Sequence, residues 1–131
     1  MNVLVIPDLH APCMHPKAIP FLKMIEKKYS CKRVVAVGDL VDWNSISMHE
    51  KDPSMPSASE EFALAWKQVR QVHKAFPKVD FLIGNHDALP ARKAKLIGLP
   101  QEAIYDFKDL WKLKGWKVHP RYAKIYIDGV H

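Results

Sequence analysis

Three short apolar runs, each followed at once by acidic, imidazole or amide side chains, constrain the fold of this chain more than any other feature. The runs lie within residues 3–7, 33–37 and 79–83. Short apolar runs bounded by turn formers are typical of strands that are buried on both faces, as in parallel sheets. Helix-like apolar spacing separates each run from the next. This alternation predicts an α/β domain with a parallel β-α-β-α-β core.

The other elements follow from apolar spacing and from capping and turn residues. Ser57-Ala58-Ser59-Glu60 is a capping-box pattern, so a long helix is expected to begin there. Asp128-Gly129 is a hairpin signal that should lead into a returning strand. Periodicity predicts helices over residues 17–29, 57–76, 90–97 and 101–114, and strands over residues 116–118 and 122–127.

Candidate ligand residues follow all three buried strands. Because the carboxyl ends of parallel strands meet at one edge of a sheet, these side chains should converge on one crevice. Carboxylate, imidazole and amide ligands together suit Mn²⁺, Fe or Zn²⁺. The residues that we expect to hold metal are Asp8, His10, Asp39 and Asn85.

Two neighbours of these ligands have the chemistry for catalysis. His86 could protonate a leaving oxygen, and Asp87 could orient the imidazole ring of His86. The alternative for Asp87 is a solvated loop residue. For Asp42, a turn or capping role is favoured over metal ligation. Two metal ions roughly 3.5–4 Å apart would hold a hydroxide and clamp a phosphate for in-line attack.

The three motifs, taken in this order, resemble those of the calcineurin-like metallophosphoesterase family. They read Asp8-x-His10, Gly38-Asp39-x-x-Asp42 and Gly84-Asn85-His86-Asp87. The irregular segment 50–58 is similar to that of small phage-borne or bacterial members. The resemblance implies a hydrolase acting on a phosphate mono- or diester, with two divalent metal ions.

The resemblance also implies a role for each matching residue. Asp8 and His10 would bind one metal, Asp39 would bridge both, and Asn85 would bind the other. Asn85 and His86 would contact the phosphate, and His86 would serve as the acid.

The family has two later motifs, His-Gly and Gly-His-x-His, and neither occurs in residues 1–131. His131 is not assigned to them. The resemblance therefore implies an N-terminal portion of the domain, with an incomplete second sheet and a second metal site that is weak or empty. A sheet edge left exposed in this way favours pairing with another copy of the chain. The alternative function is a catalytically incomplete domain that binds metal weakly, or an interaction or nucleic-acid-binding module.

Length and composition fit one domain over residues 1–131. The chain is 48% hydrophobic, which suffices for a globular core. It has no apolar run of membrane-spanning length and no signal-peptide pattern, so we expect a cytoplasmic protein that avoids membranes. The net charge is +6, and all of the excess lies in residues 61–131, with 13 basic and 7 acidic side chains. A basic half suits a phosphate ester or nucleic acid, although a solvated basic face is an equally good interpretation.

Overall fold

A four-stranded parallel sheet forms the centre of the computed structural model, which describes residues 1–128. The spatial order of the strands is the same as their order along the chain, and each adjacent pair is parallel. The α/β class and the parallel β-α-β-α-β core are therefore confirmed, and a fourth parallel strand extends that core. The strands are β1 (Val3–Ile6), β2 (Arg33–Ala36), β3 (Asp80–Leu82) and β4 (Lys117–His119).

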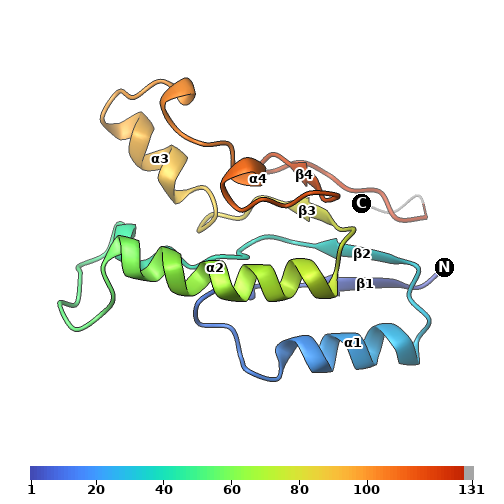
Figure 1. The fold of residues 1–131 in the computed structure, drawn as a ribbon. Coiled ribbons are helices and arrows are strands. Elements are labelled where there is room, and N and C mark those ends of the chain that lie inside the picture. The colour runs from blue at the N-terminus through green and yellow to red at the C-terminus, as the bar shows by residue number, and fades with distance from the viewer. Residues whose placement is uncertain (129–131) are drawn as a thin grey trace.

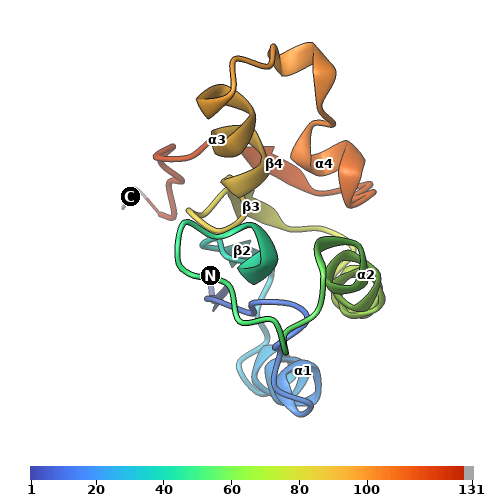
Figure 2. The same cartoon turned by 90° about the vertical axis from the view of Figure 1, so that its left-hand side faces the viewer.

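Two long helices provide the crossovers between the first three strands. Helix α1 (Ala18–Lys28) joins β1 to β2, and α2 (Ala58–Ala75) joins β2 to β3. Both helices lie on the same face of the sheet, whereas the C-terminal segment leads to the other face (Figures 1 and 2).

Helix α2 begins and ends where its sequence predicts. The Ser57 hydroxyl accepts a hydrogen bond from the backbone N–H of Glu60 at 3.3 Å and donates one to the Glu60 carboxylate at 2.9 Å. The helix buries Ala65, Val69 and Val72 against the sheet. These residues recur every three or four positions, so a single apolar stripe faces the core.

The prediction of one helix over residues 101–114 is wrong. The segment forms two short helices instead, η2 (Gln101–Ala103) and α4 (Phe107–Leu110). Ile104 and Asp106 between them have extended backbones, with ψ of 154° and 144°. This break lets the chain turn, so that Trp111 and Leu113 become fully buried. The free energy gained by burying those two side chains exceeds the free energy that a continuous helix would gain.

The prediction of a strand over residues 122–127 is also wrong. Those residues do not form a strand, and the backbone carbonyl of Tyr126 accepts a hydrogen bond from Nη1 of Arg33 at 2.8 Å. The strand expected at 116–118 is confirmed with a shift of one residue, and the remaining helix, α3, spans Leu89–Leu96. The hairpin expected at Asp128-Gly129 and the position of His131 lie outside the described residues.

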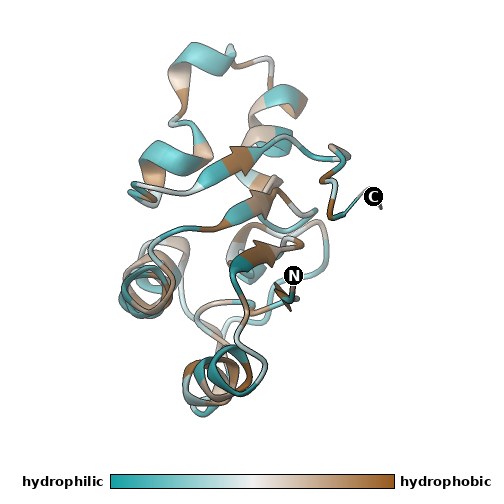
Figure 3. Ribbon diagram, turned by 90° about the vertical axis from the view of Figure 1, so that its right-hand side faces the viewer, coloured by the Kyte–Doolittle hydropathy of each residue, from teal (hydrophilic) through white to brown (hydrophobic). Residues whose placement is uncertain are grey.

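Apolar residues concentrate in the strands (Figure 3), and buried apolar side chains of the strands and of α2 belong to one core cluster. Trp43, Phe62, Trp66 and Trp111 form an aromatic cluster beneath the loop after β2, with ring centroids of Phe62 and Trp111 4.9 Å apart. The described residues form one sheet, in which β1 and β4 are the edge strands. Among the described helices, none combines the length and the apolar character needed to span a membrane.

Candidate metal centre and active site

Three loops meet at the carboxyl edge of the sheet, as the sequence predicts. The loop after β1 pairs with the loop after β2, because the backbone N–H of His10 donates to the carbonyl of Asp39 at 2.9 Å. The N–H of Ala11 donates to the carbonyl of Leu40 at 2.8 Å, and Ala11 and Val41 form a parallel bridge. The two loops thus continue the β1–β2 pairing past the strands and bring their side chains into register.

The candidate ligands of the first two motifs converge. Single donor atoms of Asp8, His10 and Asp39 all lie within 4.8 Å of one another. Nε2 of His10 is 3.8 Å from Oδ2 of Asp39. Two carboxylates and an imidazole in this arrangement are a donor set that suits a borderline divalent metal ion.

Asp39 is held so that one of its carboxylate oxygens remains directed at this cluster. Its Oδ1 accepts a hydrogen bond from the backbone N–H of His86 at 3.0 Å, which leaves Oδ2 facing His10. The same bond joins the loops after β2 and β3. Asn85 is exposed and immediately precedes His86, whose backbone N–H makes this bond.

His86 and His10 are neighbours across the site, although they come from different strands. Their ring centroids are 4.8 Å apart, and the rings meet edge to face. Nδ1 of His86 lies 2.6 Å from the backbone carbonyl oxygen of Asp42. A carbonyl only accepts hydrogen bonds, so Nδ1 carries a proton and Nε2 is the atom left for chemistry.

Asp42 has a larger part in the site than its sequence position suggested. Its Oδ1 lies 2.9 Å from Nδ1 of His10 and 3.7 Å from Nδ1 of His86. A carboxylate bonded to Nδ1 fixes the tautomer that leaves the Nε2 lone pair of His10 available to a metal. The spacing of the motif does not reveal this role, because the contact depends on the pairing of the loop after β1 with the loop after β2.

Among the described residues, the Asp87 carboxylate bonds to backbone N–H groups and not to the ring of His86. Its buried carboxylate accepts three backbone N–H bonds, from Asp39 and Gly84 at 2.8 Å and from Val41 at 3.1 Å. Burial raises the pKa of Asp87 to about 6, an effect opposed by the hydrogen bonds from Gly84 and Val41. The neighbouring charge of Asp39 raises that pKa further. Asp87 thus ties the loops after β2 and β3 together, and His86 is oriented through Asp42.

Two glycines allow these loops to approach closely. A Cβ at Gly84 would lie 2.2 Å from Oδ1 of Asp39, and a Cβ at Gly38 would lie 2.7 Å from the Cα of Gly84. Gly38 also has a φ of +97°, which other residues rarely adopt. The position of the Asp39 carboxylate therefore depends on the absence of side chains at both positions.

Backbone strain is concentrated in the same loops. Asp8, His10, Asp39 and Trp43 have positive φ angles between 32° and 52°, which are uncommon for residues with a side chain. Strained conformations persist where the surrounding contacts over-determine them, and they cluster at functional sites. The buried carboxylate of Glu61 supplies one such contact, because it accepts the backbone N–H bonds of Asn44 and Ser45 at 2.9 Å.

The fold and the site define an α/β protein with a cluster of metal-compatible side chains at the carboxyl edge of a parallel sheet. A family model for calcineurin-like phosphoesterases matches residues 1–130, so the chain belongs to that family. No curated protein and no solved structure gives a significant match to the chain. Metal-dependent hydrolysis of phosphoesters is the chemistry that this family suggests.

Proposed function

We propose that this chain hydrolyses a phosphate mono- or diester with the help of two divalent metal ions. The observation that supports this function best is the convergence of Asp8, His10 and Asp39 beside the ring of His86. In the proposal, Asp8, His10 and Asp39 hold one ion, and Asp39 and Asn85 hold the other. Such ions activate a water molecule and neutralise charge on the phosphate when they are bound.

The protein residues then orient the reactants and move a proton. Asp42 holds the proton on Nδ1 of His10, at 2.9 Å, and so presents Nε2 of that ring to the metal. The carbonyl of Asp42 fixes the ring of His86 through Nδ1. A proton on Nε2 of His86 passes to the oxygen of the departing alcohol, while the carboxylate of Asp42 attracts the positive charge of the ring from 3.7 Å.

Turnover of an aryl phosphodiester and an aryl phosphomonoester with added Mn²⁺ tests this proposal. Wild type is compared with His86→Ala, and with His49→Ala as a control in an exposed loop. We expect activity that EDTA abolishes, that falls by about 10²–10⁴-fold in His86→Ala, and that persists in His49→Ala. Equal inactivity of all three proteins with excess metal would instead favour the catalytically incomplete domain, and Mn²⁺ binding by calorimetry would show whether that domain still holds metal.

A further inference from the structure

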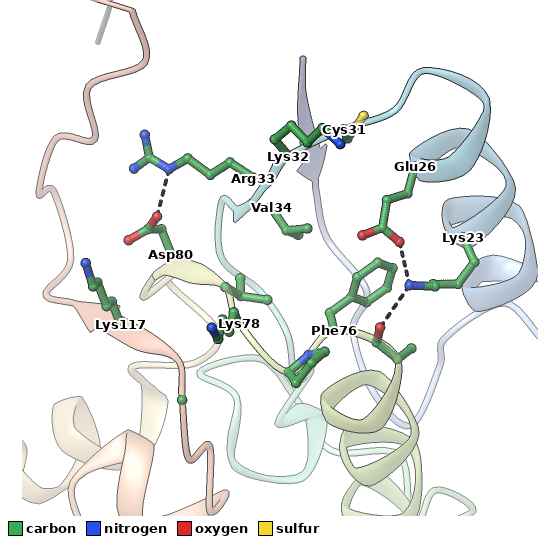
Figure 4. A pocket seen from close by; sticks show the side chains of 14 residues that line it. Lys23, Glu26, Cys31, Lys32, Arg33, Val34, Phe76, Lys78, Asp80 and Lys117 are labelled. Atoms are coloured by element: carbon green, nitrogen blue, oxygen red, sulfur yellow. Dashed lines mark hydrogen bonds and ion pairs between the residues drawn. The ribbon is translucent and has the colours of Figure 1, made fainter. Parts of the chain in front are cut away.

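A second candidate site lies at the amino-terminal ends of the strands, opposite the carboxyl ends that carry the candidate metal centre. A pocket of about 420 Å³ opens where β2, β3 and β4 begin, between the ends of α1 and α2 (Figure 4). Arg33, Asp80 and Lys117, which are the first residues of those strands, line it. The strands are parallel, so the candidate metal centre lies at their other end, about 13 Å away for a strand of four residues.

The pocket carries an excess of positive charge. Five cationic side chains line it against two carboxylates, Glu26 and Asp80. Both carboxylates have cationic partners: Nζ of Lys23 donates to Glu26, and Nε of Arg33 donates to Asp80 at 2.8 Å. Nε2 of His119 lies 3.4 Å from the other oxygen of Asp80. These two pairs form fixed neutral parts of the wall (Figure 4).

Three lysines carry the uncompensated charge. Lys32, Lys78 and Lys117 are exposed, and their ammonium groups make no hydrogen bond or ion pair with any residue from 1 to 128. Lys32 and Lys78 shortly precede β2 and β3, and Lys117 is the first residue of β4. The sheet register therefore holds the three backbones around one opening. Three like charges around one concave surface attract anions, because they raise the local potential more than scattered surface lysines would.

The floor of the pocket offers no flat surface for a ring. Phe76 is only 1% exposed, and Nζ of Lys23 lies 4.9 Å from its ring centroid. Phe76 therefore exposes almost no ring surface, and the ammonium group of Lys23 lies over the ring. Recognition there must depend on charge, because stacking of a base or another aromatic group has no platform.

We propose that this pocket binds a compact oligophosphate, whether it is free or forms the phosphate chain of a nucleotide. The pocket volume falls within the range of small-molecule sites, and three free ammonium groups match the charge of linked phosphates. The site is independent of the proposed hydrolytic activity. Its ligand binds without divalent metal and is not the ester cleaved at the other edge of the sheet.

Calorimetric titration of the whole chain with sodium tripolyphosphate in the presence of EDTA tests the proposal. The test variant is Lys78→Ala/Lys117→Ala, and the matched control is Lys51→Ala/Lys67→Ala, which removes the same charge from exposed positions outside the pocket. All four positions are exposed, so both variants should keep the wild-type melting temperature. We expect one binding site, with affinity at least about tenfold weaker in the test variant and within about twofold of wild type in the control.

Two further titrations identify the ligand class. ATP should bind within about threefold of tripolyphosphate, and a 15-nucleotide single-stranded oligonucleotide should bind no more tightly than tripolyphosphate. The proposal is overturned if tripolyphosphate does not bind at millimolar concentration, or if both double variants lose affinity equally. It is also overturned if ATP or the oligonucleotide binds more than about tenfold more tightly, since that would require recognition of a base or a longer chain.

Discussion

Asp87 reaches from the loop after β3 to the backbone of Asp39 in the loop after β2, where its Oδ2 accepts the Asp39 N–H at 2.8 Å. The same oxygen accepts the N–H of Gly84, and Oδ1 accepts that of Val41. One buried carboxylate therefore fixes the backbone of a candidate metal ligand. The consequence is that the geometry of the metal centre and the stability of the fold depend on the same side chain.

Asp87→Ala should destabilise the fold by about 2 kcal/mol or more, because three backbone N–H groups would lose their acceptor. Urea denaturation measures this change in the free energy of unfolding. Asp109→Ala, at an exposed position, is the control and should change stability by less than about 0.5 kcal/mol. A loss of similar size in the two variants would contradict the structural role of Asp87.

Asp42→Asn should lower turnover without unfolding the protein. The substitution removes the negative charge beside Nδ1 of His10 and His86 and keeps the backbone carbonyl that holds His86. We expect a fall in metal affinity or in kcat of about 10–100-fold, with a melting temperature close to wild type. Asp52→Asn, in an exposed loop, should retain full activity. Unchanged metal binding and turnover in Asp42→Asn would remove Asp42 from the site.

Gly84→Ala should weaken both metal binding and the fold, because a Cβ at this position would also lie 2.5 Å from the backbone nitrogen of Asp39. The added methyl group would meet Oδ1 of Asp39 at 2.2 Å and must push that carboxylate away. Mn²⁺ affinity measured by calorimetry should fall by about tenfold or more. Gly98→Ala is the control, since a Cβ there meets nothing within 4 Å although φ is +75°. Its Mn²⁺ affinity should equal that of wild type, whatever its effect on stability.

Acid should weaken the ion pair at the start of β3. Burial raises the pKa of Asp80, but hydrogen bonds and charges from Arg33 and His119 outweigh it, so the pKa lies below its usual range. A lowered folded-state pKa gives stability that is complete above about pH 5 and is lost as the pH falls through about 3.9 and below. The stability difference between wild type and Asp80→Asn, about 1 kcal/mol at pH 7, should therefore shrink by half or more at pH 3. A difference that stays constant between pH 7 and pH 3 would exclude this ion pair as its source.

The sequence alone was sufficient for the class of the fold and for the identity of the residues at the carboxyl edge. Strand and helix periodicity are local properties, and parallel strands place their carboxyl ends together whatever the loops do. Asp8, His10, Asp39 and His86 could be expected to meet on that ground. Their assignment as metal ligands and proton donor stays a prediction.

Only the tertiary structure determines the conformation of segments whose contacts are with residues distant in the sequence. The break between Gln101–Ala103 and Phe107–Leu110 occurs because Trp111 and Leu113 are buried. Residues 122–127 form no strand, and Ile127 makes only a β-bridge. The exchange of roles between Asp42 and Asp87 has the same origin. Which oxygen faces which ring depends on loop pairing and on glycine contacts across two strands, and neither is encoded in the spacing of a single motif.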